Sequence, residues 1–488
     1  MAVEKSESNN SLAPDAEVGA STEAVDLDEG SSKVKFLLGL LRKLVGVKDI
    51  SAIRLSLPAS LMEPESNLEF WNYMDRPDYF ISIPDGDTPE ERMLRVIRWW
   101  YSKDTKWKDQ RIKKPYNSVL GERFLCWWDV AADAEEGDLD IAPTESVSLD
   151  GEGVTTETAG AGSKRKTLKV TSVTEQISHH PPVSAYYYEC KEKGIIGRGV
   201  DHIAARFTGT NVKVGPGVQN HGIYITLTSH NNEEYNIQHP WASITGWLSG
   251  SPYITVSESA IIACPQTGLK AVLEYKDEPT FGKAKFAIEG KVFRYDYDAD
   301  KKFTEKERKE REKLSKIPAA DVVCKLHGQW NGKIYVTSAP DASNKSTKST
   351  KSDTSSSRKS SSSLSSAAST DARLLFDMHA SSPAVKQTLP IAQQHPLESR
   401  RMWEAVTTAL LQKESQAATA AKRKLEDEQR TLAAERAAKE AGKHEFESWF
   451  FEFKGDRDAR PGPPVDMDRA KPYLRKGREP EFGVLDRS

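Results

Sequence analysis

The sequence predicts an α+β protein in which one large antiparallel β-sheet lies between an N-terminal helical segment and a helical C-terminal part. Residues 117–337 contain many short β-rich runs separated by turn residues, a pattern typical of antiparallel strands. Residues 396–442 are rich in Ala, Glu, Lys, Gln and Arg and end in Ala-Gly, which indicates one long helix or two broken ones. We expect more than eight strands, enough to enclose a ligand cavity if the sheet closes into a barrel.

The first amphipathic segment is residues 33–48. At about 100° per residue its apolar side chains cover a broad arc, and Arg42 and Lys43 lie on the opposite face. Such a helix could lie in a membrane interface, fold over an apolar opening as a lid, or pack in a core. Residues 49–116 follow as a predicted helical segment around an aromatic cluster that includes Trp71, Trp99 and Trp100.

Charge is distributed unevenly along the 488 residues, whose formal net charge is −3. Residues 1–32 carry −7, residues 132–163 carry −9, and residues 340–370 carry +3. These segments have too few large apolar side chains to offset their chain entropy. We therefore expect an acidic disordered tail (1–32), an acidic disordered insertion (132–163) and a Ser/Lys-rich linker (338–370). The C-terminal part (371–488) follows the linker. The remaining chain carries +10, which suits a membrane surface, a phosphorylated ligand or a nucleic acid.

Several classes of protein are excluded by what the sequence lacks. No run approaches the roughly 18–20 uncharged apolar residues that a membrane span needs, and the acidic N-terminus does not resemble a secretory signal. The four cysteines lie 60 or more residues apart, which argues against a zinc knuckle, a CxxC redox pair or a dense disulfide framework. We expect an intracellular protein without a transmembrane segment, with reduced thiols, and with no metal and no cofactor other than bound ligands.

The most specific motif is Glu175–Val183, which reads EQISHHPPV. Paired prolines after paired histidines prevent continuation of a strand or helix, so both imidazoles would be presented from a stiff turn. A metal site would need a third ligand, and a catalytic base would need a nucleophile; neither is evident nearby. Two interpretations remain. The imidazole N–H groups bind an anion, or the segment forms only a structural turn.

Taken as a whole motif, EQISHHPP resembles the EQxSHHPP fingerprint of the oxysterol-binding protein family. Three further segments resemble family motifs and occur in the family's order. They are Lys113–Glu122 (KKPYNSVLGE), Gly328–Gly332 (GQWNG) and Gln394–Arg400 (QHPLESR). The resemblance spans Val34 to Phe453 and is similar to the short fungal members that consist of the lipid-binding domain alone. It implies a near-complete antiparallel β-barrel around an apolar lipid tunnel, with an N-terminal helical lid and a helical C-terminal part.

The resemblance also implies a set of ligand residues. Family members bind a sterol or another lipid in the tunnel, and many bind phosphatidylinositol 4-phosphate instead, with its headgroup at the mouth. The positions that match the family's headgroup contacts are Lys114, Asn117, His179, His180, Lys422, Glu426 and Arg430. The last three are spaced i, i+4 and i+8, so Glu426 could orient both cations; a solvated salt-bridge face is the alternative. The lid residues would be Phe36, Leu37, Leu40, Leu41 and Leu44, closing over the mouth.

The function that follows is lipid transfer without catalysis, in which a sterol is exchanged for phosphatidylinositol 4-phosphate between membranes. Expected partners are membrane lipids and anionic membrane surfaces, not nucleic acid. The protein would be cytoplasmic and peripheral on the endoplasmic reticulum, Golgi or plasma membrane, or at their contact sites. Ser118 replaces the family's usual proline, and the stretch between Trp99 and Lys114 is shorter than in sterol-binding short members. Transfer of phosphatidylserine or another glycerolipid, and a lipid sensor without net transport, are therefore the alternatives. For Glu122 and Arg400 we expect structural roles.

Overall fold

The part of the chain that the computed structural model describes covers most of the predicted helical and β segments. These are residues 62–108, 114–132, 166–179, 181–208, 211–246, 253–279, 283–339, 372–439, 446–454, 471–478 and 480. The predicted tail (1–32) and lid helix (33–48, with all five lid residues) lie outside the described residues. The same holds for His180 and for most of the predicted insertion and linker. What the sequence predicts for them stays a prediction.

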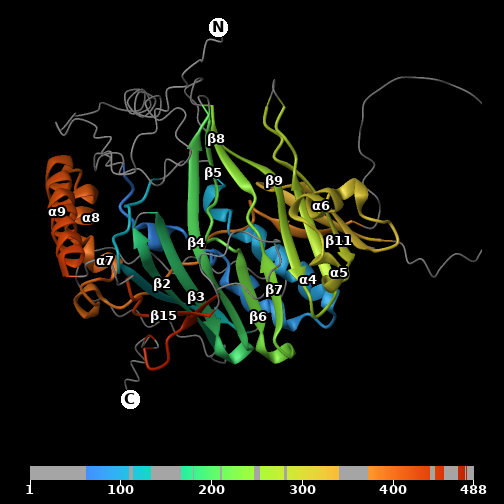
Figure 1. The fold of residues 1–488 in the computed structure, drawn as a ribbon, viewed down its shortest axis with the longest axis horizontal. Helices are drawn as coiled ribbons and strands as arrows, with labels where there is room; N and C mark the ends of the chain where they lie inside the picture. Colours follow the sequence, from blue (N-terminus) through green and yellow to red (C-terminus); the bar gives the residue numbers. More distant parts are fainter. Residues whose placement is uncertain are drawn as a thin grey trace, which may run out of the picture.

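One 14-stranded antiparallel sheet forms the body of the molecule (Figure 1), as the sequence predicts. Its main path runs β1-β2-β3-β4-β5-β8-β9-β10-β11-β12-β13-β14, and β6 and β7 pair with each other beside β4 and β9. The strands are β1 Arg123–Ala131, β2 Thr167–His179, β3 Pro182–Cys190, β4 Ile195–Phe207, β5 Val212–Pro216, β6 Ile223–Leu227, β7 Glu233–Ile237, β8 Trp241–Thr245, β9 Tyr253–Cys264, β10 Leu269–Tyr275, β11 Ala287–Arg294, β12 Val322–Gln329, β13 Lys333–Ser338 and β14 Arg373–Asp377.

The sheet curves into a nearly complete ring. Its end strands β1 and β14 do not pair with each other. Instead the chain beyond β14 returns to β1, where Trp127 and Gln387 exchange two backbone hydrogen bonds of 2.9 Å, and the Arg123 N–H donates to the Leu397 carbonyl at 2.9 Å. The seam between the two ends is therefore bridged by a loop rather than by a ladder of strands.

The N-terminal helices lie inside this ring. They are α2 Asn67–Phe70, α3 Pro77–Ser82 and α4 Pro89–Ser102, followed by short 3-10 turns at Ile83–Asp85 and Thr105–Trp107. Thr88 caps α4 by accepting from the Glu91 N–H at 3.1 Å, with Pro89 in the first turn. Residues 99–101 of α4 are at most 1% exposed and share one core cluster with inward-facing strand residues such as Ile262. The guanidinium of Arg92 ties α4 to β7 through Glu233, at 3.0 and 2.8 Å.

Alternation along the strands separates an inner from an outer core. Ala260 and Ile262 of β9 face the inner cluster with α4, whereas Ile261 lies in an outer cluster. That outer cluster lies beside a short helical excursion, α5 Tyr297–Asp300 and α6 Glu305–Arg311, and includes Leu314 of the 3-10 turn that follows. The buried ammonium of Lys270 on β10 holds this excursion through the Asp300 and Glu312 carboxylates, at 2.7 and 3.2 Å.

The C-terminal part differs from the expectation of helices alone. It contains α7 Ser399–Met402, α8 Glu404–Leu411 and α9 Ser415–Lys439, so the predicted helix is broken twice. It also contains β14 of the main sheet and a separate two-stranded sheet, β15 Phe451–Lys454 and β16 Lys471–Leu474. The helices α7, α8 and α9 lie on the side of the molecule opposite α5 and α6 (Figure 1).

Two further facts bear on the class of protein. Among the helices in the described ranges, none is both long enough and apolar enough to cross a bilayer. All four cysteines are buried and unpaired, which agrees with the expectation of reduced thiols.

A buried carboxylate holds the seam of the ring together. Glu122, immediately before β1, is 0% exposed. Its oxygens accept hydrogen bonds from the Ser66 hydroxyl at the start of α2 (2.5 Å) and the Val119 N–H (3.0 Å). They also accept from the Ser399 hydroxyl on α7 (2.7 Å) and the Trp403 indole N–H (3.1 Å). One side chain thus joins segments from three regions of the chain, which is the structural role expected for it.

Replacing this carboxylate tests its role in stability. We expect Glu122→Met to lower the free energy of unfolding by about 2–4 kcal/mol, because a thioether of similar size leaves the buried N–H groups of Val119 and Trp403 without an acceptor. Urea unfolding monitored by tryptophan fluorescence measures the change. Glu305→Met, at an exposed ion pair on α6, is the control and should change the free energy by less than about 0.5 kcal/mol. Equal effects of the two substitutions would contradict the role assigned to Glu122.

Candidate phosphate site and lipid cavity

The turn at residues 114–117 presents two of the predicted headgroup residues. The Lys114 ammonium donates to the Asn117 Oδ1 at 2.6 Å and to the Pro115 carbonyl at 3.1 Å. Between them the Tyr116 ring is buried and stacks on Trp403, with ring centroids 4.6 Å apart. Tyr116 thus anchors the turn to the C-terminal helices and leaves Asn117 exposed.

The long helix α9 contributes the second group of predicted residues. The Lys422 side chain is 7% exposed and its Nζ lies 2.5 Å from the Glu426 Oε1. Arg430 pairs instead with Asp427, and its side chain is 57% exposed. Of the two cations that Glu426 is expected to orient, Lys422 pairs with it in this structure, whereas Arg430 pairs with Asp427. Asp427, three residues from Arg430, takes the guanidinium away from the predicted face.

Lys422 lies close enough to Lys114 to affect the charge of the Lys114 ammonium. The pKa of Lys114 is lowered to about 8, mainly because the ammonium is buried and secondarily because the positive charge of Lys422 is near. Its hydrogen-bond acceptors are both neutral oxygens. Lys422 has a carboxylate partner, Glu426, whereas these acceptors of Lys114 are uncharged, so an anion bound near Lys114 would relieve the repulsion from Lys422.

The β2–β3 hairpin, which carries the fingerprint motif, is attached directly to the same region. The Gly121 N–H donates to the Gln176 carbonyl at 2.9 Å, and the Gln176 N–H donates to the Glu122 carbonyl at 2.8 Å. His179 ends β2, where it is paired with Pro182 of β3. The backbone therefore joins the strand that ends at His179 to the segment that follows Lys114 and Asn117. The side chain of His180 lies outside the described residues.

A group of polar side chains lies on the inner wall of the ring, and sequence reasoning missed it. The Tyr73 hydroxyl donates to the Asp201 carboxylate at 2.7 Å, and it lies 3.5 Å from the His239 Nε2. The Tyr73 ring is 5.3 Å from Tyr186, and the His239 ring is 5.5 Å from Trp100 of α4. No local sequence signal marks these residues, because they are spread over more than 160 positions and meet only in the folded ring.

Burial tunes this inner cluster toward neutral forms. Desolvation raises the pKa of Asp201 to about 7, although the hydrogen bond from Tyr73 and the charge of Lys106 oppose the shift. Desolvation and the nearby charge of Lys103 lower the pKa of His239 to about 3, so the imidazole is neutral at physiological pH. The cluster can therefore donate and accept hydrogen bonds beside the apolar core of the ring without holding a strong charge.

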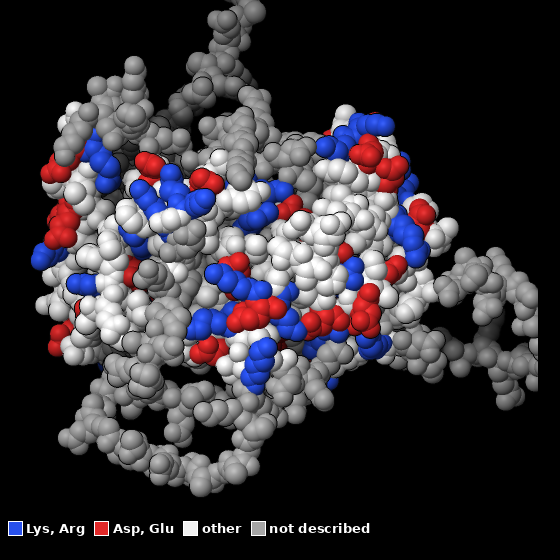
Figure 2. Space-filling model, turned by 90° about the horizontal axis from the view of Figure 1, so that it is seen from below, with Lys and Arg blue, Asp and Glu red and all other residues white. Residues whose placement is uncertain are grey.

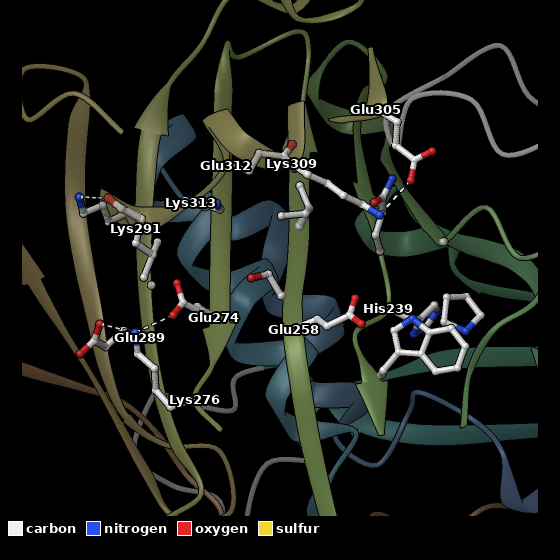
Figure 3. A pocket seen from close by; sticks show the side chains of 18 of the residues that line it. His239, Glu258, Glu274, Lys276, Glu289, Lys291, Glu305, Lys309, Glu312 and Lys313 are labelled. Atoms are coloured by element: carbon white, nitrogen blue, oxygen red, sulfur yellow. Dashed lines mark hydrogen bonds and ion pairs between the residues drawn. The ribbon is translucent and has the colours of Figure 1, made fainter. Parts of the chain in front are cut away.

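A hollow of about 1380 Å³ is lined by His239 of the inner cluster, by residues of strands β9 to β12 and by α6 (Figure 3). Charged groups of both signs line it, and several are paired. Lys276 lies 2.7 Å from Glu274 and 2.8 Å from Glu289, and Lys309 lies 2.9 Å from Glu305. None of the predicted headgroup residues lines this hollow, which separates it from the phosphate site.

On the face of the molecule seen in Figure 2, basic and acidic side chains are interspersed. Another motif residue, Arg400, is held in an ion pair, with its Nη2 2.6 Å from the Glu69 Oε1. This pairing supports the structural role that we expect for Arg400.

Comparison with known proteins identifies the family. A model of the oxysterol-binding protein family matches residues 36–462. Oxysterol-binding protein-like protein 1 of Schizosaccharomyces pombe is 32% identical over 94% of this chain and 93% of its own length. The fold is similar to the Osh1 ORD domain in complex with ergosterol, with a TM-score of 0.56 and 17% identity over 90% of this chain and 86% of that one. It is also similar to the Saccharomyces cerevisiae Osh3 ORD in complex with PI(4)P, with a TM-score of 0.53 and 16% identity over 90% of each chain.

The matched model covers nearly the whole chain, and the ring-shaped antiparallel sheet agrees with the solved structures. The chain belongs to the oxysterol-binding protein family, whose members bind and transfer lipids.

Proposed function

We propose that this protein carries a sterol inside the ring and exchanges it for phosphatidylinositol 4-phosphate between membranes. The observation that carries the proposal is the pair Lys114 and Lys422, held together beside the strand that ends at His179. A phosphomonoester headgroup carries about −1.5 to −2 charge at neutral pH, which suits a site with two nearby cations. The complex of Osh3 with PI(4)P supports the same ligand.

The inner cluster favours a sterol as the second ligand. A sterol has one hydroxyl group at the end of a rigid apolar body, whereas an acyl chain ends in a methyl group. The hydrogen-bonding groups of Tyr73, Asp201 and His239 would be left without a ligand partner by a methyl group and could bind a hydroxyl. The complex of Osh1 with ergosterol supports this assignment. A glycerolipid such as phosphatidylserine remains the alternative cargo.

In this proposal the protein is not an enzyme and acts in the cytoplasm, peripherally on membranes or at their contact sites. No group of three or more His, Cys, Asp or Glu side chains that could hold a metal occurs in the part of the chain that the structure describes. The predicted lid helix, residues 33–48, would cover the apolar cargo and release it at a bilayer. Rapid transfer between vesicles would distinguish a carrier from a lipid sensor that binds the same ligands without transport.

The paired histidines provide the direct test of the exchange. We expect His179→Ala together with His180→Ala to abolish extraction of phosphatidylinositol 4-phosphate from vesicles while leaving sterol binding within about twofold, because the apolar cavity is unchanged. His327→Ala together with His379→Ala, at two exposed positions, is the matched control. Loss of both lipids with a lower melting temperature would instead indicate that the histidines only form a turn.

The pKa of Lys114 predicts a pH dependence. The phosphate binds the protonated ammonium, so affinity for phosphatidylinositol 4-phosphate should be full below about pH 8 and fall as the pH rises through that value. The fall can reach about tenfold per pH unit if one proton is lost. Lys114→Arg should abolish this dependence, because a guanidinium stays charged. A binding titration from pH 6.5 to 9.5 tests this, and an identical decline in the arginine variant would contradict it.

The inner cluster predicts which lipid the protein binds selectively. Tyr73→Phe should weaken binding of a 3-hydroxysterol by about tenfold, the cost of roughly one hydrogen bond, and should leave phosphatidylinositol 4-phosphate unaffected. Fluorescent sterol titration measures the change. If the purified protein carries phosphatidylserine and its loading is unchanged by this substitution, the sterol assignment is wrong.

A further inference from the structure

The C-terminal segment packs on the outer face of the strand that carries the fingerprint motif. Phe450 and Phe451 form one buried cluster with Val173 and Ile177 of β2, and Val183 of β3 belongs to the same cluster. In Figure 1 the segment with β15 lies next to β2 and β3. Part of β2 is therefore covered from outside by residues almost 300 positions later in the chain.

Glu175, the first residue of the motif, is the polar centre of this contact. It is 0% exposed. Its carboxylate accepts hydrogen bonds from the Ser448 hydroxyl at 2.5 Å, the Trp449 N–H at 2.8 Å and the Phe450 N–H at 2.9 Å. The Ser448 Oγ in turn accepts from the Phe451 N–H at 2.9 Å. All the donors to Glu175 that the structure describes come from the C-terminal segment.

Between Glu175 and His179 the strand contains a β-bulge. The β2–β3 register shifts between Gln176 and Ser178, which leaves Ile177 as the extra residue. The Gln176 side-chain amide donates to the Ser178 carbonyl at 2.6 Å across the bulge. A bulge turns the side chains that follow it, so its geometry sets the direction of His179.

The segment is also fixed at its other end. The Arg475 guanidinium donates to the Ser448 and Phe451 carbonyls at 3.1 and 3.2 Å. The Lys471 ammonium lies 2.5 Å from Glu234 on β7, which also pairs with Arg198 on β4 at 2.8 Å. The C-terminal segment is thus anchored to the wall of the ring independently of Glu175.

We propose that residues 448–451 act as an external clamp that fixes the β2 bulge and thereby aims His179 at the anion. Glu175 and Ser448 are positioning residues and do not touch the ligand. The identity of the anion as a phosphoinositide headgroup rests on the proposed function, whereas the geometric effect on His179 does not.

The first experiment reads His179 directly. In NMR spectra of protein labelled with ¹³C-histidine, the signal that disappears in His179→Ala is assigned to the His179 imidazole. We expect Ser448→Ala and Glu175→Gln to shift that signal and change its apparent pKa. Ser381→Ala is the matched control, because Ser381 is also buried and its hydroxyl also makes two hydrogen bonds. Its partners are the Arg76 guanidinium and the Asp377 carbonyl, which belong neither to β2 nor to residues 448–451. An unchanged His179 signal in both clamp variants would overturn the proposal.

The second experiment measures both lipids in the same variants. We expect Ser448→Ala to lower extraction of phosphatidylinositol 4-phosphate from vesicles by about tenfold, with sterol loading and melting temperature close to those of the Ser381→Ala control. A parallel loss of both lipids would show that the contact only supports stability, and the clamp would be rejected. If His179→Ala leaves extraction intact while Ser448→Ala still shifts the His179 signal, the proposed headgroup site fails and the clamp stands.

Discussion

The contact on which the rest of the structure depends is the buried Glu122 carboxylate with its four donors. A sheet of 14 strands that does not close through its end strands needs another connection at the seam. Glu122 supplies it by joining α2, β1 and the segment that begins with Ser399. The same connection determines the candidate site, because Lys114 precedes Glu122 by eight residues and Lys422 follows the joined helices. Without a common anchor, two mutually repelling lysines on separate segments would move apart.

The motifs that mark the family therefore combine residues with two physical roles. In KKPYNSVLGE we propose Lys114 and Asn117 as ligand residues, whereas Glu122 is buried and holds the seam. In EQISHHPP the same division recurs, since Glu175 is buried under the C-terminal segment and His179 ends the strand. A carboxylate can serve in this way because it accepts several hydrogen bonds at once and so fixes several backbone segments from one position.

Sequence reasoning predicted the antiparallel sheet and the flanking helices, because each has a local pattern; the headgroup site that the motifs predict stays a proposal. It placed all residues after 371 in a helical part, although β14 is a strand. Five residues after a low-complexity linker carry too little periodicity to reveal a partner strand, and Phe376 is buried only by the ring. Helical spacing offers Arg430 both Glu426 and Asp427 as partners, and the pairing with Asp427 depends on side-chain geometry that the sequence does not specify. The inner cluster could not be predicted, since only the folded ring brings Tyr73, Asp201 and His239 together.

The two polar regions differ in a way that bears on exchange. The inner cluster is close to neutral, since His239 is uncharged and the pKa of Asp201 is about 7. The site at Lys114 and Lys422 is cationic. In the proposed exchange, an uncharged lipid with one hydroxyl group gains hydrogen bonds from the inner cluster and nothing from the two lysines. An anionic lipid gains from the two lysines and needs only apolar space in the ring. If both cargoes place their apolar parts in the same cavity, binding one excludes the other, while their polar groups are recognised at separate places. Selectivity for each lipid could then change independently, which a single shared polar site would not permit.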